Sequence, residues 1–146
     1  MEIQAKFAGK RTFLAKGESN HWVTFDTRES SGGSGAASSP MEMVLMAMAS
    51  CSGLDVVSIL EKRRVTLQNF EMTVQGERAE SHPRVYTKIH MIYDITSPDV
   101  SEKEVDRAIR LSHDTYCSVS KMLEHTADIT FEYNITRPEP VESPAD

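Results

Sequence analysis

The chain has 146 residues, of which 39 % are hydrophobic and 26 % charged, and its formal net charge is −6. This length fits one domain with a real core, and the negative charge argues against the basic surface that nucleic-acid binding requires. Two cysteines are too few for a disulfide scaffold, and no apolar signal segment follows Met1, so we expect a cytoplasmic protein whose cysteine pair is either redox-active or inert.

The N-terminal quarter predicts a small antiparallel meander. Apolar residues alternate with polar ones in segments 2–7, 11–16 and 21–25, and turns at Gly9 and Gly17 separate the three expected strands. The Gly/Ser-rich stretch 26–38 is interpreted as an ordered loop that leads to a helix. A flexible linker would have the same composition.

Residues 39–64 predict one long helix. Ser39 is a good N-cap, Pro40 suits the first helical position, and Glu42 completes a capping box. The middle of the helix is apolar on nearly every side, with Cys51 at its centre, so we expect it to be buried. Because Glu42, Asp55 and several serines interrupt the apolar run, we do not expect it to span a membrane.

The second half predicts two further strands at 65–78 and 85–96, then two helices and a last strand at 128–136. In the strand 85–96, the face expected to point inward carries Val85, Thr87, Ile89, Met91, Tyr93 and Ile95, and the opposite face carries Tyr86, Lys88, His90 and Asp94. Ser101 and Glu104 form a second capping box, and Ser118 is the expected N-cap of the short helix after Cys117. The prediction is an α+β protein with a single domain over 1–136 and a flexible tail over 137–146.

The chemistry of the cysteines is open from the residues alone. Cys51, in an apolar helix, has the setting of an inert packing residue, whereas Cys117 stands at a helix start and on electrostatic grounds should be the better thiolate. Asp55 lies one turn after Cys51 and is expected to orient water or a hydroxyl, or to cap or pair with a partner residue. His113 and Cys117 are the only pair with suggestive metal-ligand spacing, and we expect no metal and no bound cofactor.

Two stretches resemble a known family. SPMEMVLMAMASCSGLDVVSIL and HDTYCSVSKML, the latter followed by ADITFEYNI, are similar to the two cysteine segments of the OsmC/Ohr family of osmotically inducible and organic hydroperoxide resistance proteins. The order of elements matches from Ile3 to Thr136. The resemblance implies an OsmC-like fold, with antiparallel sheets wrapped around a long central helix, in an intertwined homodimer with sites at the interface.

The resemblance also implies a function in the oxidative stress response. Cys51 would attack an organic hydroperoxide and become a sulfenic acid, and Cys117 would condense with it to a disulfide. An external dithiol of the lipoyl type would then reduce the disulfide. No nucleic acid or membrane partner is implied.

Two departures place the sequence closer to the less-characterised OsmC-like branch. The hydroperoxide reductases carry a glutamate directly after the helix-start proline, where this chain has Met41 and the carboxylate of Glu42 follows one place later. They also carry an arginine in the turn that corresponds to residues 17–21, which has none here, so Arg28 or Arg11 would have to substitute. The candidate site is therefore Cys51 and Cys117, supported by Glu42, Met41 and Arg28.

Two functional hypotheses follow. The first is a peroxidase that cycles Cys51 and Cys117 between dithiol and disulfide. The second is a non-enzymatic OsmC-like dimer that binds a small apolar or thiol-containing ligand, for which the methionines at the helix start (Met41, Met43, Met46 and Met48) could line a pocket or serve only in packing. Thiol reactivity and the distance between the two sulfurs separate the hypotheses.

Overall fold

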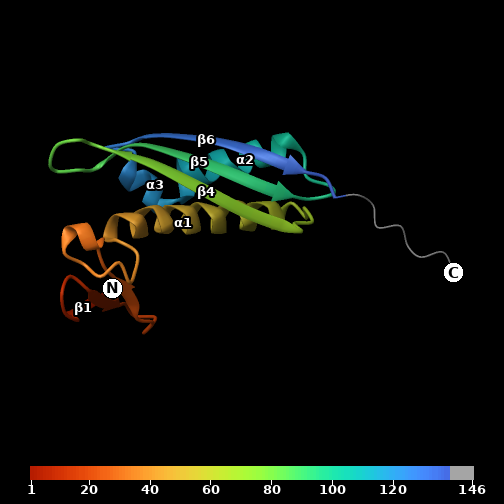
Figure 1. Cartoon of the computed structure of the whole chain (residues 1–146). Coiled ribbons are helices and arrows are strands. Elements are labelled where there is room, and N and C mark those ends of the chain that lie inside the picture. The colour runs from red at the N-terminus through yellow and green to blue at the C-terminus, as the bar shows by residue number, and fades with distance from the viewer. Residues whose placement is uncertain (139–146) are drawn as a thin grey trace. The chain divides into compact units, whose positions relative to one another are not determined.

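The computed structural model describes residues 1–138, and the chain forms two compact units, residues 1–44 and the part that begins at Leu45. Each unit contains a three-stranded sheet, and a long helix begins in the first unit and continues through the second (Figure 1). The α+β class predicted from the sequence is confirmed. The single domain over 1–136 stays a prediction.

The first unit contains the predicted meander. Strands β1 (Gln4–Phe7), β2 (Phe13–Lys16) and β3 (Val23–Phe25) pair antiparallel in the order β1-β2-β3. Many of its large apolar side chains remain exposed, namely Ile3 at 63 %, Phe7 at 62 %, Phe13 at 46 % and Trp22 at 47 %. Three strands with so little covering cannot supply a core of their own.

The Gly/Ser-rich segment is an ordered loop, as expected, with a short 3₁₀ turn at Glu29–Ser31. Its organising residue is the buried Asp26, whose carboxylate accepts hydrogen bonds from the amides of Thr27 and Ala36 and from the amide and hydroxyl of Ser34. Gly33 is needed here because a Cβ at this position would lie 2.0 Å from the carbonyl oxygen of Thr27. These contacts exclude a flexible linker.

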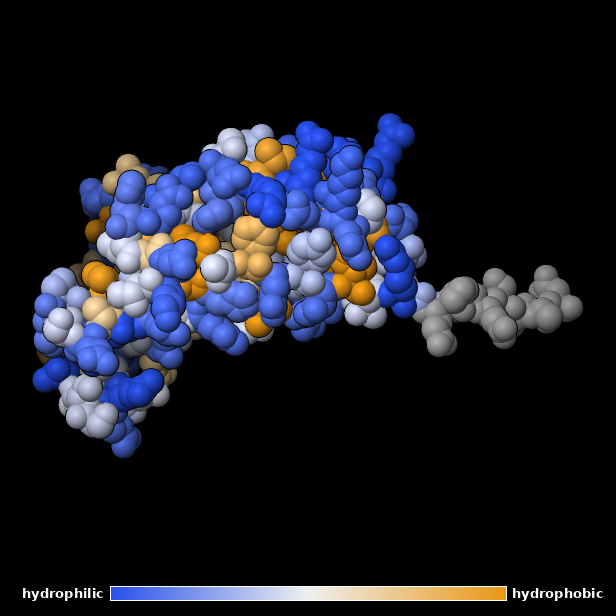
Figure 2. Space-filling model, turned by 90° about the horizontal axis from the view of Figure 1, so that it is seen from above, coloured by the Kyte–Doolittle hydropathy of each residue, from blue (hydrophilic) through white to orange (hydrophobic). Residues whose placement is uncertain are grey.

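Helix α1 (Pro40–Lys62) begins with the predicted capping box. The Ser39 amide donates to the Glu42 carboxylate at 2.7 Å, and the Glu42 amide donates to Ser39 Oγ at 3.3 Å. The helix is less buried than expected, because only 22 % of its most apolar stretch of 18 residues is buried within the chain. Figure 2 shows apolar areas on the face of the chain that is seen from above. Among residues 1–138, α1 alone is long and apolar enough to cross a membrane, so the polar residues do not exclude a span on composition alone.

The second unit is built on a sheet of order β4-β5-β6, formed by β4 (Asn69–Arg78), β5 (Tyr86–Thr96) and β6 (Asp128–Thr136). β4 and β5 form an antiparallel hairpin, whereas β5 and β6 are parallel. The expectation of antiparallel sheets is therefore wrong for the pair of β5 and β6. A parallel pair needs a long crossover, which the two helices between β5 and β6 supply.

One face of this sheet is apolar and packs against helices. Directly paired residues place Met72, Tyr93 and Tyr133 on the same face, and the central positions Ile89, Met91, Tyr93 and Ile95 of β5 are buried as predicted. The alternation fails at the start of β5, where Tyr86 is buried and Val85 and Thr87 are exposed. The cause is a register shift at Glu77 and Arg78, after which the Tyr86 ring packs over Gly76.

The helices between β5 and β6 follow the predicted order with one addition. α2 (Glu102–Leu111) has the capping box of Ser101 and Glu104, a single π-helical turn (Ser112–Tyr116) follows, and α3 (Ser118–Leu123) leads to β6. α1 also lies along this sheet (Figure 1), where Gly53 leaves space for the sulfur of Met72. Of the predicted tail, Arg137 donates hydrogen bonds to the carbonyls of Ser97 and Val100, and residues 139–146 lie outside the described part of the chain.

Candidate functional site

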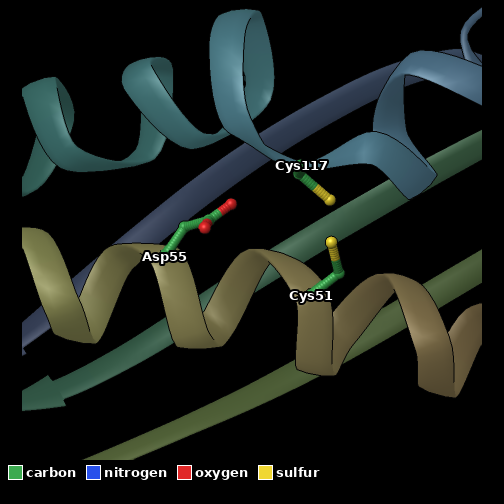
Figure 3. A group of neighbouring side chains, drawn as sticks. All are labelled: Cys51, Asp55 and Cys117. Carbon is green, nitrogen blue, oxygen red and sulfur yellow. The ribbon is translucent and has the colours of Figure 1, made fainter.

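The two cysteines lie together although 65 residues of sequence separate them. Cys51 points from the middle of α1 toward Cys117, which stands between the π-helical turn and α3 (Figure 3). Their sulfurs and a carboxylate oxygen of Asp55 all lie within 4.8 Å of one another. Both thiols are free, with Cys51 half-buried and Cys117 fully buried. A rotation of the side chains could bring the sulfurs into bonding distance.

Cys117 is the N-cap of α3, so the expectation that Ser118 caps this helix is wrong. The Cys117 sulfur accepts a hydrogen bond from the amide of Ser120 at 3.4 Å. The Cys117 amide donates to the carbonyl of Ser112 at 2.8 Å, which closes the π-helical turn. The cysteine that follows this turn points toward α1 (Figure 3). The backbone on both sides of Cys117 is therefore fixed by its own hydrogen bonds.

The electrostatics of Cys117 differ from the sequence expectation. Burial raises the pKa of the Cys117 thiol, the hydroxyl and amide of Ser120 act against this, and a hydrogen bond shared with Cys51 adds to the rise. The loss of hydration on burial therefore outweighs the effect of the helix start, which was expected to lower the pKa of this thiol.

Asp55 is held in place by a chain of buried hydroxyl groups. Ser112 Oγ donates to Asp55 Oδ2 at 3.1 Å and lies 3.0 Å from Ser52 Oγ, which in turn lies 2.7 Å from the hydroxyl of Tyr93. Burial raises the pKa of Tyr93 to about 12, so its hydroxyl stays protonated. The chain connects the carboxylate beside the thiols with the sheet, and it confirms that Asp55 pairs with a hydroxyl.

A cleft of about 270 Å³ opens beside Asp55. Its walls come from the second half of α1, from α2 and from Tyr116, and they carry the cationic side chains Lys62, Arg63 and Arg107. Arg63 lies 3.4 Å from a carboxylate oxygen of Glu104. The second unit therefore has a positively charged cleft with the Asp55 carboxylate on its wall.

The other predicted site residues belong to the first unit. Glu42 serves the helix cap, and the hydrogen bonds from Ser39, with a smaller contribution from the charge of Arg28, hold its pKa below the usual range. The structure thus brings Arg28 within electrostatic reach of Glu42. Met41 is half-buried in the first turn of α1.

Sequence reasoning missed the roles of Ser52, Ser112 and Ser120. A serine in an apolar helix gives no signal of its partner, and only the fold reveals that these three hydroxyl groups are buried beside the thiols. The pair His113 and Cys117 does not form a ligand set in the described residues, because the His113 ring packs against Phe131 with 6.3 Å between the ring centroids. Asp55, and not His113, lies beside the two sulfurs.

Comparisons with known proteins agree on one family. The model of the OsmC-like protein family matches residues 32–132. Protein YhfA of Escherichia coli K12 is 41 % identical over 136 residues, which cover 92 % of this chain and 98 % of YhfA.

Solved structures extend the likeness to the fold. The crystal structure of a hypothetical protein from Aquifex aeolicus is 30 % identical, with a TM-score of 0.78, over 93 % of this chain and 97 % of that one. An organic hydroperoxide resistance protein from Legionella pneumophila has the same fold, with a TM-score of 0.67 at 14 % identity over 92 % and 97 % of the two chains.

Proposed function

Because the chain belongs to the OsmC-like protein family, we propose that it reduces organic hydroperoxides with its pair of thiols. The observation that carries this proposal is the approach of two free sulfurs, on different elements, to within 4.8 Å of each other. A structural relative from Legionella pneumophila bears the name of an organic hydroperoxide resistance protein. A thiol pair at this distance is suited to a dithiol-disulfide cycle.

The proposed reaction has two steps in the protein. The thiolate of Cys51 attacks the outer peroxide oxygen, the O–O bond breaks, and the alkoxide takes a proton and leaves as an alcohol, which oxidises Cys51 to a sulfenic acid. The sulfur of Cys117 then attacks the sulfur of Cys51. The S–O bond breaks, and the departing hydroxide takes the proton of Cys117 and leaves as water. An external dithiol of the lipoyl class returns both cysteines to thiols.

The assignment of Cys51 as the attacking residue rests on its exposure and on the raised pKa of Cys117. Cys51 is half-buried and reachable, whereas Cys117 has no exposed surface. Burial raises the pKa of the Cys117 thiol, which disfavours Cys117 as the attacking thiolate. The burial of Cys117 also keeps the resolving thiol away from further oxidants.

The oligomeric state and the cellular compartment of the protein belong to the same proposal. The protein acts as a homodimer, which is supported by the exposed apolar side chains of the first unit and by exposed Met46 and Leu54 on α1. A second copy would cover the part of α1 that one chain leaves bare. In such a dimer α1 would be a core helix, and the reducing cytoplasm is the compartment in which a thiol pair is regenerated.

The experiment that tests the role order traps the intermediate. The Cys117→Ser variant, which has lost the resolving thiol, is treated with one equivalent of cumene hydroperoxide in the presence of dimedone and analysed by peptide mass spectrometry. We expect the sulfenic acid adduct on Cys51. The matched Cys51→Ser variant should give no adduct on Cys117 in the same time. An adduct on Cys117 in the Cys51→Ser variant would reverse the roles. An unmodified thiol in both variants would contradict the proposed reaction.

A further inference from the structure

The same three side chains have the composition of a metal centre, which goes beyond the proposed peroxide chemistry. Cys51 and Asp55 are four residues apart on α1 and therefore project from one face of the helix, one turn apart. Cys117 reaches this face from the start of α3 (Figure 3). Their two sulfurs and one carboxylate oxygen lie within 4.8 Å of one another.

These distances suit a tetrahedral ion. With metal–sulfur bonds of about 2.3 Å and metal–oxygen bonds of about 2.0–2.2 Å, neighbouring ligand atoms lie roughly 3.5–3.8 Å apart. Small changes of side-chain torsion would bring the three atoms of this cluster to that spacing. The two thiolates are soft donors that favour Zn²⁺ over Mg²⁺ or Ca²⁺, and a carboxylate oxygen is an accepted third ligand of Zn²⁺.

The surroundings of the three groups resemble the outer shell of a metal site. Ser112 donates a hydrogen bond to the carboxylate of Asp55, and the Ser120 amide donates to the Cys117 sulfur, so both ligands are oriented by neighbours. The hydroxyl of Ser120 is fully buried beside the same sulfur, where it lowers the pKa of the thiol and would stabilise a thiolate.

The charge of such a centre would also be compensated. Two thiolates and one carboxylate around a divalent ion leave a single negative charge. The cleft on whose wall Asp55 lies carries the cationic side chains Lys62, Arg63 and Arg107. The cleft and the half-exposed Cys51 give an ion access from solvent.

We propose that the reduced protein binds one Zn²⁺ ion through Cys51, Asp55 and Cys117, with a fourth position open to water. This centre holds both thiolates on the metal, so the loaded protein keeps its cysteines from alkylation and from disulfide formation. The sequence predicted no metal because Asp55 and Cys117 are 62 residues apart and share no motif.

The test uses Co²⁺ as a spectroscopic probe for the Zn²⁺ site. The reduced, metal-free protein is titrated with Co²⁺ without oxygen, and the absorption of tetrahedral cobalt and of the thiolate-to-cobalt charge transfer is recorded. We expect saturation at one equivalent per chain and full displacement by one equivalent of Zn²⁺. Absence of the charge-transfer band, or a band that grows without saturation, would overturn the proposal.

Variants assign the ligands. Cys51→Ser and Cys117→Ser should each lower the charge-transfer intensity to about half or less, and Asp55→Asn should keep a two-thiolate band but weaken Co²⁺ binding at least about tenfold. The matched carboxylate control is Asp106→Asn on α2, whose partner is Arg110, and it should bind like the wild type. Unchanged affinity in Asp55→Asn would remove this residue from the site, and unchanged bands in either serine variant would contradict the ligand set.

A second readout does not depend on cobalt or on correct folding of the variants. Wild-type protein with and without one equivalent of Zn²⁺ is treated with iodoacetamide and analysed by intact mass spectrometry. The proposal expects at least about tenfold slower alkylation of both cysteines with Zn²⁺, and equal rates would refute it. No peroxide is present, so the result is independent of whether the hydroperoxide reaction occurs.

Discussion

The amide of Ser120 donates a hydrogen bond to the sulfur of Cys117 at 3.4 Å, so the cysteine proposed to resolve the sulfenic acid is also the side-chain cap of α3. A thiol that caps a helix has a fixed direction, and here that direction is toward Cys51. The same atom therefore contributes to the fold and is positioned for chemistry.

The capping role predicts different stabilities for two substitutions of Cys117. Serine keeps a side-chain acceptor for the Ser120 amide, whereas alanine removes it, so Cys117→Ala should be less stable than Cys117→Ser by about 1 kcal/mol. Urea unfolding of the two reduced variants measures this difference. Equal stability would show that the sulfur does not act as a cap.

The contrast in burial predicts the order of thiol modification. With metal-free, reduced protein at neutral pH, iodoacetamide should modify Cys51 at least about tenfold faster than Cys117, because Cys117 is fully buried and its pKa is raised. Peptide mass spectrometry over a time course gives both rates. Faster modification of Cys117 would contradict the assigned geometry.

The hydroxyl chain behind Asp55 predicts a cost for removing its anchor. Tyr93→Phe removes the partner at 2.7 Å from Ser52 Oγ and should lower the free energy of unfolding by about 1 kcal/mol. The matched control is Tyr116→Phe, because Tyr116 is 57 % exposed and its hydroxyl should contribute little. Thermal unfolding of the two variants tests this prediction. Equal losses of stability in both would contradict the role of the Tyr93 hydroxyl in the buried hydrogen bonds.

The raised pKa of Tyr93 predicts that the stability of the protein changes at alkaline pH. Its pKa in the folded state is about 12, against 10.0 for the ordinary value, so the folded protein holds this proton more tightly than the unfolded chain. The resulting stability is complete below pH 10 and is lost as the pH rises toward about 12. The advantage of wild type over Tyr93→Phe should narrow in this interval. A difference in stability between wild type and Tyr93→Phe that increased in this interval would contradict the raised pKa.

Asp26 predicts the opposite dependence at acid pH. The hydrogen bonds from Ser34, Thr27 and Ala36 lower its pKa from 3.8 to about 2, so its contribution is complete above pH 4 and is lost as the pH falls toward about 2. Asp26→Asn should have a lower melting temperature than wild type at neutral pH. The two melting temperatures should become equal as the pH falls toward about 2. Asp128→Asn, at the exposed start of β6, is the control and should change little. A constant difference between Asp26→Asn and wild type across this range would contradict the assignment.

Much of the fold could be predicted because the local signals agree with the tertiary structure. The capping boxes at Ser39 and Ser101 mark both long helices, and alternation marks the central part of β5. The parallel pairing of β5 with β6 was not predictable, because alternation gives the face of a strand but not its neighbour. The burial of Tyr86 depends on a register shift at which Thr87 of β5 has no paired residue on β4, and the alternation of the segment gives no signal of this shift.

The site could be predicted only in part. The approach of Cys51 to Cys117 followed from a family resemblance and not from the spacing of the residues, which are far apart in the chain. The π-helical turn at Ser112–Tyr116 has no clear sequence signature, and it is followed directly by Cys117, which caps α3 in place of Ser118. Burial, which raises the pKa of Cys117 against the effect of the helix start, is a property of the fold alone.

The most direct test of the central claim is the rate at which wild-type protein forms its disulfide with an organic hydroperoxide. Reduced, metal-free protein is mixed with one equivalent of cumene hydroperoxide, quenched with acid at intervals and measured by intact and peptide mass spectrometry, with hydrogen peroxide as the comparison. The account predicts loss of the mass of two hydrogens within seconds, a bond between Cys51 and Cys117, and faster reaction with the organic oxidant. Two thiols that remain unchanged after minutes would contradict it.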